Sequence, residues 1–113
     1  MNKFKIGQEI IIDEDHTIQS LLTNKMTWIR AGDKGFIDSN GNIHYTTGDA
    51  RGKIAPYTRK ENLKGYDIQN IALMIYKKLD TEFDISGLAY LYDDDVEKQD
   101  VLDILEDLLI EIL

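Results

Sequence analysis

The sequence predicts an α+β fold, in which a small curved antiparallel sheet over about residues 4–48 precedes two or three helices packed on one side. Short alternating runs and turn residues dominate the first half, whereas apolar residues recur at helical spacing in the second half. The strand signals all come before the helix signals. At 113 residues the chain is expected to be a single domain, 1–113, with a β-rich part over about residues 1–56 and a helical, acidic part over about residues 57–113.

Four segments carry strand signals: residues 8–13, 26–31, 35–39 and 42–47. The first contains three consecutive isoleucines, and β-branched side chains favour extended backbone. Asn40-Gly41 predicts a hairpin with a type I′ turn, because that turn needs positive φ at both central positions. We expect the last three strands to form a meander that the first strand joins. Residues 16–22 stay open between a strand and a helical turn, since their apolar spacing also fits a helix.

Helices are predicted after the sheet. Asp67 is a candidate N-cap, and the apolar residues that follow it lie on one face at 3.6 residues per turn: Ile68, Ile71, Ala72, Ile75, Tyr76 and Leu79. A second stripe with the same period defines the C-terminal helix and is expected to face a core: Val101, Ile104, Leu105, Leu108, Leu109 and Ile112. Between the two, residues 84–92 fit either a short helix or a strand.

The composition limits compartment and chemistry. The chain contains no cysteine, which excludes disulfides, thiol catalysis and cysteine-ligated zinc. Acidic residues bracket the short apolar run near the N-terminus, so the sequence there does not resemble a signal peptide. No segment approaches the roughly 18 consecutive apolar residues of a membrane-spanning helix. We therefore expect a cytoplasmic protein, and the bias toward Lys, Ile, Asn and Asp favours a bacterial or phage genome.

Motifs for catalysis or metal binding are weak, and we expect no cofactor, no bound metal and no enzyme activity. Asp13–His16 gathers four possible ligands, but successive residues of a strand point to opposite faces. Residues 38–49 imitate a calcium loop, yet Ile43 stands where that loop needs glycine, and a hairpin explains these residues better. Neither His16 nor His44 has a cysteine or an obvious serine partner nearby in the sequence.

Charge is distributed unevenly along the chain. The net charge is −8 at pH 7, but residues 1–79 hold 12 Lys/Arg against 9 Asp/Glu, a net of +3. Residues 80–113 hold one base, Lys98, against 12 acids, a net of −11. Because charges in physiological salt interact over about 8–10 Å, this local difference matters more than the total.

The acidic C-terminal part predicts a binding surface. Exposed helices usually interleave Lys with Glu, whereas here like charges stand three or four residues apart, which destabilises a helix. A basic partner would offset this repulsion. The predicted partner-binding residues are Asp93, Asp94, Asp95, Glu97, Asp100, Asp103, Glu106 and Asp107. Apolar residues at the end of the chain extend past one face, and they predict a dimer or helix contact through Leu109, Ile110, Ile112 and Leu113.

The small size, the lack of cysteine and the dense acidic surface resemble those of phage- and plasmid-borne inhibitors, namely the anti-CRISPR proteins directed at Cas9 and the antirestriction DNA mimics. This resemblance concerns the character of the whole chain. It implies a non-catalytic inhibitor whose carboxylates replace phosphates in the basic channel of a defence nuclease and so block binding of guide RNA or DNA. The implied partner is a basic protein, such as Cas9 or its guide-RNA complex.

Two alternatives stay open. Residues 4–12, followed by the meander and Gly35-Phe36-Ile37, are similar to small SH3-like barrels, in which a strand entered through a glycine precedes a turn and a Gly-apolar-apolar strand. That similarity implies an SH3-like half-barrel acting as an adaptor, which dimerises through its C-terminal helix. The second alternative is a nucleic-acid-binding domain that uses a basic loop over residues 51–64. Its candidate residues are Arg51, Lys53, Tyr57, Arg59, Lys60 and Lys64.

Overall fold

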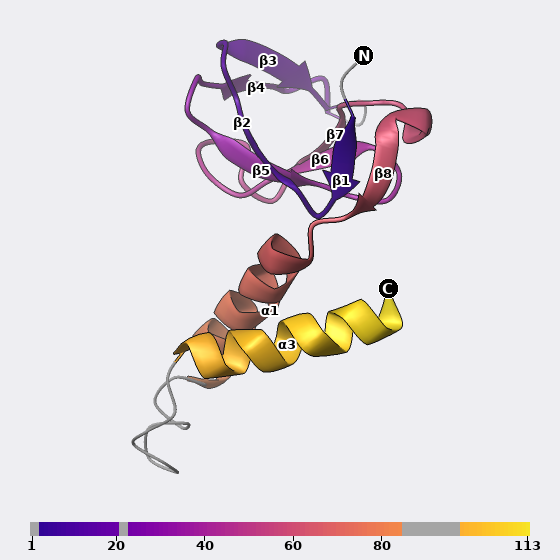
Figure 1. Ribbon diagram of the computed structural model, residues 1–113. Coiled ribbons are helices and arrows are strands. Elements are labelled where there is room, and N and C mark those ends of the chain that lie inside the picture. The colour runs from indigo at the N-terminus through magenta and orange to yellow at the C-terminus, as the bar shows by residue number, and fades with distance from the viewer. Residues whose placement is uncertain (1–2, 21–22, 85–97) are drawn as a thin grey trace. The chain divides into compact units, whose positions relative to one another are not determined.

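The computed structural model describes residues 3–20, 23–84 and 98–113 of the chain. Contacts group the chain into two compact units, Met1–Tyr66 and Asp67–Leu113. In the described residues, the first unit consists of strands and one short 3-10 helix, and the second consists of helices (Figure 1). We call them the β-unit and the helical unit. The α+β class expected from the sequence is confirmed.

The elements of the β-unit are short. In chain order they are β1 (Phe4–Ile6), β2 (Glu9–Ile11), β3 (His16–Gln19), β4 (Met26–Ile29), β5 (Lys34–Ile37), β6 (Asn42–Tyr45), β7 (Ile54–Pro56), the 3-10 helix η1 (Lys60–Asn62) and β8 (Leu63–Tyr66). The helical unit contains α1 (Ile68–Phe83) and α3 (Lys98–Ile112).

The strands form three small sheets. The largest is antiparallel with the order β2-β5-β6-β7, β3 pairs with β4 in a two-stranded antiparallel ribbon, and β1 pairs with β8 in parallel. The predicted joining of the first strand to the hairpin is confirmed, because β2 pairs with β5. The predicted meander is wrong at its first step, since β4 pairs with β3. A turn after β4, in which the Asp33 carboxylate accepts from the Arg30 amide at 2.9 Å, redirects the chain toward β2.

The hairpin expected at Asn40-Gly41 is present, but with a different loop. Ile37 pairs with Ile43, and the Asp38 amide donates to the Asn42 carbonyl at 2.9 Å, so the loop holds three residues rather than two. Gly41 has a φ of 83°, whereas Asn40 does not have positive φ, so the type I′ expectation is wrong. Three-residue hairpin loops end in one left-handed residue, which glycine adopts without strain.

One apolar core connects the three sheets. Ile29 of β4, Ile37 of β5 and Ile43 of β6 have no exposed surface. The buried cluster comprises Ile10, Ile12, Ile29, Ile37, Ile43, Tyr45 and Ala50, and Phe4, Ile18, Ala55 and Leu63 pack against it. Because these residues come from every sheet, the short strands surround a single interior (Figure 1). Each sheet is too small to be stable alone, so the shared core stabilises all of them.

Strands continue well past residue 56, where the sequence placed the end of the β-rich part. The segment 51–64, expected to be a loop, contains β7, η1 and the start of β8. Leu63-Lys64-Gly65-Tyr66 carries no clear alternation, and it is extended because it pairs with β1, which lies at the other end of the unit in sequence. Such a non-local partner leaves no mark on a local pattern.

The first helix agrees closely with its prediction. Asp67 caps α1, since its Oδ1 accepts from the Asn70 amide at 3.1 Å. Ala72 and Tyr76 are buried, and the other residues of the predicted stripe are half-buried. The helix ends at Phe83, and its C-cap residue, Asp84, has a left-handed φ of 50°. The sequence left open whether residues 84–92 form a short helix or a strand. Of these residues, only Asp84 lies within the described part of the chain.

The second helix differs from its prediction on one side. α3 packs on α1 through a line of half-buried residues: Val101, Leu102, Leu105, Glu106 and Leu109. Leu102 therefore belongs to the packed face, although the sequence placed it off the main stripe. Ile104, Leu108 and Ile112, expected in the core, are exposed. A single neighbouring helix covers a narrow stripe, whereas the sequence pattern is broader than that. Neither described helix is long and apolar enough to cross a membrane.

Candidate functional site

Four carboxylates follow one side of α3: Asp100, Asp103, Asp107 and Glu111. All four residues are exposed. Successive members are three or four positions apart, so at 3.6 residues per turn they share an arc of about 80° around the helix axis. We call this set the acidic row. Glu111 was not among the predicted binding residues, although its spacing of four from Asp107 would have identified it.

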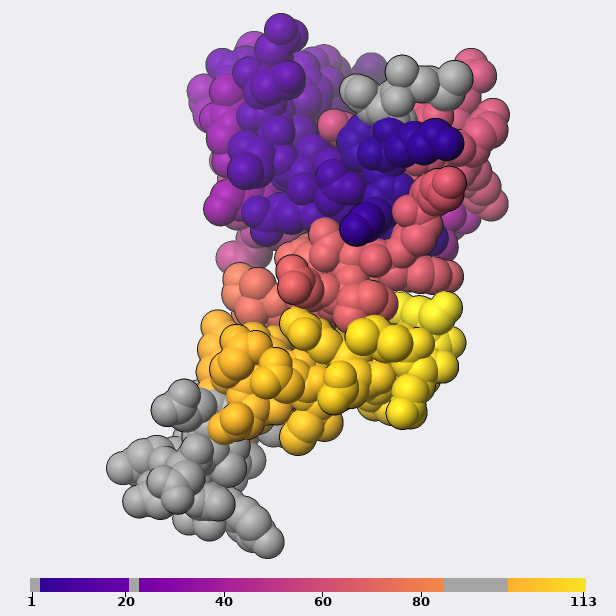
Figure 2. Space-filling view, viewed as in Figure 1, coloured from indigo at the N-terminus to yellow at the C-terminus, as the bar shows by residue number. Residues whose placement is uncertain are grey.

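An apolar row borders the acidic row. Ile104, Leu108 and Ile112 stand four residues apart and are 68%, 49% and 67% exposed. Ile104 lies three residues before Asp107, and Leu108 lies three before Glu111, so the side chains of the two rows are neighbours on the helix surface. We call Ile104, Leu108 and Ile112 the apolar row. On the face seen in Figure 2, the side chains of α3, coloured orange to yellow, form a continuous surface.

The structure brings together only part of the predicted acidic surface. Asp100, Asp103 and Asp107 lie together on α3, whereas Glu106 is half-buried in the line that packs on α1. The remaining members, Asp93, Asp94, Asp95 and Glu97, lie outside the described residues. Exposed carboxylates therefore remain the main feature of the described part of this surface.

The predicted dimer contact does not lie on one face. Leu109 is half-buried in the helical unit, whereas Ile110, Ile112 and Leu113 are 66%, 67% and 50% exposed. On a helical projection, Ile110 lies beside Asp103 on the acidic side, and Ile112 belongs to the apolar row. Exposed apolar side chains therefore lie on more than one side of α3, with Ile112 in the apolar row and Ile110 on the acidic side.

Few basic groups neutralise the acidic row within the described ranges. The side-chain amide of Gln99 donates to Asp103 Oδ1 at 2.8 Å. Neither Asp107 nor Glu111 has an ion pair among the described residues. Lys98, the one basic residue of α3, has its ammonium 5.4 Å from the centre of the Tyr76 ring. Like charges at this spacing destabilise an isolated helix by a few tenths of a kcal/mol per pair. An external cation or basic partner would remove that cost.

The basic residues predicted to bind nucleic acid are exposed, with Lys60 in η1, Lys64 in β8 and the others, Arg51, Lys53 and Arg59, in the connecting segments. Tyr57 packs edge-on against Phe4, with ring centres 5.5 Å apart, and keeps 41% of its surface exposed. Phe4 of β1 pairs with Leu63 of β8, and both pack against the core. The exposed Lys5 and Lys64 directly follow these two residues, and the sequence pattern did not include Lys5 among the basic candidates.

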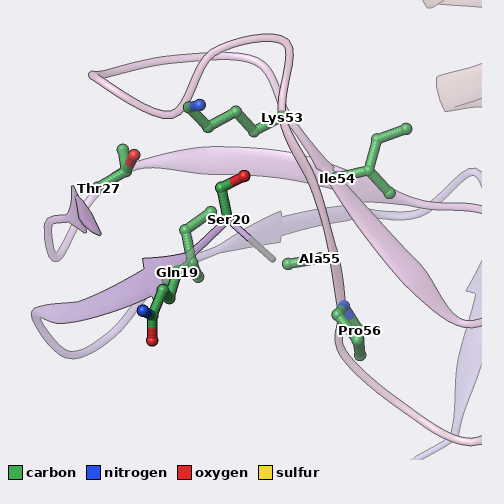
Figure 3. Close-up of a pocket in the computed structure, with 8 residues that line it drawn as sticks. Gln19, Ser20, Thr27, Lys53, Ile54, Ala55 and Pro56 are labelled. Carbon is green, nitrogen blue, oxygen red and sulfur yellow. The ribbon is translucent and has the colours of Figure 1, made fainter. Parts of the chain in front are cut away.

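A groove of about 650 Å³ lies within the β-unit (Figure 3). Its lining residues are Ile18, Gln19, Ser20, Thr27, Lys53, Ile54, Ala55 and Pro56. The Tyr45 amide donates to Lys53 and the Tyr57 amide donates to Gly41, so alternate residues of β7 face β6. The amide and carbonyl of Ile54 therefore point to the outer edge of β7. Pro56 has no amide donor, which limits pairing along that edge.

The two histidines have structural partners. His44 Nε2 lies 2.7 Å from Asp38 Oδ2, and its ring stacks on Phe36 with centres 4.7 Å apart. Burial raises the pKa of the Asp38 carboxyl, but hydrogen bonds from His44 and from the amides of Asn42 and Asn40 outweigh it and hold that pKa below 3.8. His16 Nδ1 lies 3.0 Å from the Glu14 carbonyl.

The segments that imitate metal sites also have structural roles. The Asp15 carboxylate accepts from the Ala31 amide at 2.7 Å, and Asp38 accepts from the loop amides of Asn40 and Asn42 at 2.8 and 2.9 Å. Among the residues that the structure describes, no group of three or more acidic or histidine side chains is placed to hold a metal ion. Of the carboxylates that resembled ligands in the sequence, Asp15 and Asp38 accept hydrogen bonds from backbone amides.

Comparison with known proteins gave no matching family model, no matching curated protein and no matching solved structure. The geometry leaves three candidate surfaces: the two rows of α3, the exposed lysines of the paired strands β1 and β8, and the groove beside β7.

Proposed function

We propose that this protein is a non-catalytic, cytoplasmic inhibitor that binds a basic, nucleic-acid-binding surface of a bacterial defence nuclease through the acidic row of α3. One observation carries the proposal. Four exposed carboxylates lie on one face of a helix, with no basic residue between Asp100 and Glu111. Lys and Arg side chains that hold a phosphate backbone would bind such a row in its place.

The spacing of the row suits a single strand better than a duplex. Asp100 and Glu111 are eleven residues apart, so the row covers about 16 Å at 1.5 Å per residue, or roughly one charge per 5 Å. A nucleic-acid duplex carries one phosphate per ~1.7 Å of axis and a single strand one per ~3.4 Å. The row of α3 therefore imitates a short single strand, of the kind that a guide RNA or a displaced DNA strand provides.

A competition experiment tests this proposal. A Cas9-type nuclease is mixed with labelled guide RNA, or with labelled target DNA after guide loading, and binding is followed by mobility shift as the protein is added. The protein is expected to displace the nucleic acid, and displacement should weaken as salt rises because the contact is between charges. Absence of displacement with both ligands at low salt would reject this class of partner.

Matched charge reversals separate the acidic row from bulk charge. The test variant carries Asp103→Lys, Asp107→Lys and Glu111→Lys. The control carries Glu9→Lys, Asp13→Lys and Glu14→Lys, which changes the net charge equally at exposed residues of the β-unit. Displacement should fall more than tenfold for the first variant and less than twofold for the control. Equal loss in both would mean that net charge alone acts, and no loss in the first would exclude the row.

A second candidate function is the SH3-like adaptor, which the groove beside β7 favours. The outward amide and carbonyl of Ile54 could pair with an extended peptide, and Ile18 and Ala55 offer apolar surface beneath it. In this case Ile54→Pro, which removes the free donor, should abolish capture of the partner. The same variant should leave nuclease inhibition unchanged if the first proposal is correct.

A further inference from the structure

The apolar row of α3 is the least expected exposed surface in the described part of the molecule. Ile104, Leu108 and Ile112 have the spacing of core residues, yet Leu108 is 49% exposed and the other two are 68% and 67% exposed. Single exposed apolar residues are common, but three in a continuous line on one helix mark an interaction site. The packing of α3 on α1 uses the neighbouring line of Val101, Leu105 and Leu109 and leaves this row free.

The border between the two rows limits what can cover the apolar one. Asp100 precedes Ile104 by four residues, Asp107 follows Ile104 by three, and Glu111 follows Leu108 by three, so carboxylates lie beside the first two residues of the apolar row. Any surface that buries the row brings its own edge to within a few ångströms of these charges. Complementarity then requires Lys or Arg along that edge.

A second copy of this chain does not meet the requirement. Two α3 helices packed through their apolar rows would place two acidic rows side by side, which repel each other. An anionic membrane surface is disfavoured by the same carboxylates.

We infer that the acidic and apolar rows act together as one docking face whose occupant is a basic amphipathic helix, with an apolar stripe on Ile104, Leu108 and Ile112 and with Lys or Arg against the acidic row. The inference rests on the proposed function in using the same helix, and it adds the class of partner surface. The mixed surface explains how a short helix can discriminate: charges attract many basic surfaces, whereas burial of the apolar row occurs only when the partner presents matching apolar spacing.

Peptide binding tests the inference without a natural partner. The probe is a fluorescent 18-residue peptide of leucine and lysine with its leucines at helical spacing, and the control probe is a scrambled peptide of the same composition. Fluorescence anisotropy is measured at 0.05 and 0.5 M salt. The protein is expected to bind the helical peptide at least tenfold more tightly than the scrambled one, and this preference should persist at high salt, because apolar contacts are not screened.

Variants of the two rows give separate signatures. Ile104→Gln with Leu108→Gln and Ile112→Gln should reduce the preference to less than twofold while low-salt binding keeps its salt dependence. Asp103→Asn with Asp107→Asn and Glu111→Gln should weaken binding of both peptides and flatten the salt dependence. The matched control, Ile11→Gln with Met26→Gln, changes residues of the β-unit that are 61% and 55% exposed and should have no effect. Circular dichroism checks that α3 remains helical, and Ile104→Gln alone serves if the triple variant unfolds.

Three results would overturn the inference: equal binding of both peptides, an apolar-row variant that binds like the control, or a dimer of the free protein that the apolar-row variant abolishes. These results are distinct from failure of the proposed function. Peptide preference without nuclease inhibition would reject the nuclease as partner and leave the docking face standing. Inhibition that the apolar-row variant leaves intact would reject the docking face and leave the inhibitor proposal standing.

Discussion

Asp38 Oδ2 and His44 Nε2 lie 2.7 Å apart and connect the β5–β6 loop to the strand that follows it. The other carboxylate oxygen of Asp38 accepts from the amides of Asn40 and Asn42. One side chain thus satisfies two loop amides and holds the ring of His44 against Phe36. The residues that imitated a calcium loop in sequence are explained by this arrangement, in which backbone amides and a histidine take the place of a cation.

The hairpin should make stability depend on acid. Because its bonds hold the pKa of Asp38 below 3.8, the carboxylate stabilises the fold at pH values above 3.8 and loses that contribution as pH falls through its folded pKa. Asp38→Asn should lower the free energy of unfolding by about 1–3 kcal/mol at pH 7 and by less at pH 3. Urea unfolding followed by Trp28 fluorescence measures both values. The same deficit at both pH values would show that the charge is not involved.

Two glycines with positive φ should respond differently to substitution. Gly41 has a φ of 83°, and an added Cβ would collide with the Thr58 carbonyl, whereas Gly32 has a φ of 94° and no atom within 4 Å of an added Cβ. Gly32→Ala should cost about 1–2 kcal/mol from backbone strain alone. Gly41→Ala should cost about 1–3 kcal/mol more, because the backbone of residue 58 must move. Equal losses of unfolding free energy would contradict the close approach at Gly41.

The shared core should be sensitive to loss of volume. Ile37 is fully buried among residues from all three sheets, so Ile37→Ala should reduce the free energy of unfolding of the β-unit by about 2–5 kcal/mol. Ile54→Ala removes the same atoms from a side chain that is 57% exposed and should cost under about 1 kcal/mol. Thermal unfolding of the two variants under one condition compares them directly.

A neutral hydrogen-bond acceptor should be able to replace the Asp67 carboxylate as the N-cap of α1. Asp67→Ala removes the acceptor for the Asn70 amide and should destabilise the helix by about 1 kcal/mol. Asp67→Ser restores an acceptor and should recover most of that loss. Hydrogen exchange at the amides of the first turn of α1 reports the effect locally. If serine and alanine behaved alike, the carboxylate would act through its charge on the helix dipole instead.

Local patterns predicted the elements whose stabilising contacts are local. The α1 cap and stripe, the β5–β6 hairpin and the spacing of Asp100, Asp103 and Asp107 all depend on residues within a few positions of one another. The pairing of β4 with β3 and of β1 with β8 was missed, since a strand partner is chosen by the whole core rather than by the strand. β8 is the clearest case, because Leu63–Tyr66 has neither alternation nor a β-branched residue.

The candidate site shows the same limit. Helical spacing alone placed the carboxylates on one face. Which apolar residues of α3 remain exposed depends on where α1 packs, and this decided against Ile104 and Leu108 as core residues. The apolar residues of α3 are spread evenly about the predicted stripe, whereas α1 covers only one side of that stripe.

The parallel pairing of β1 with β8 also has a consequence for biosynthesis. Phe4 pairs with Leu63, so the first strand has no described partner until 59 further residues have been made. Most of the β-unit is therefore synthesised before β1 can pair with β8. Until then, the isoleucine-rich strands between them have an incomplete core. Translational pausing, chaperone binding or truncation before residue 66 would act on that open intermediate. A fragment with only strands β2 to β7 contains most of the buried isoleucines but lacks the β1–β8 sheet, so it is expected to be prone to aggregation.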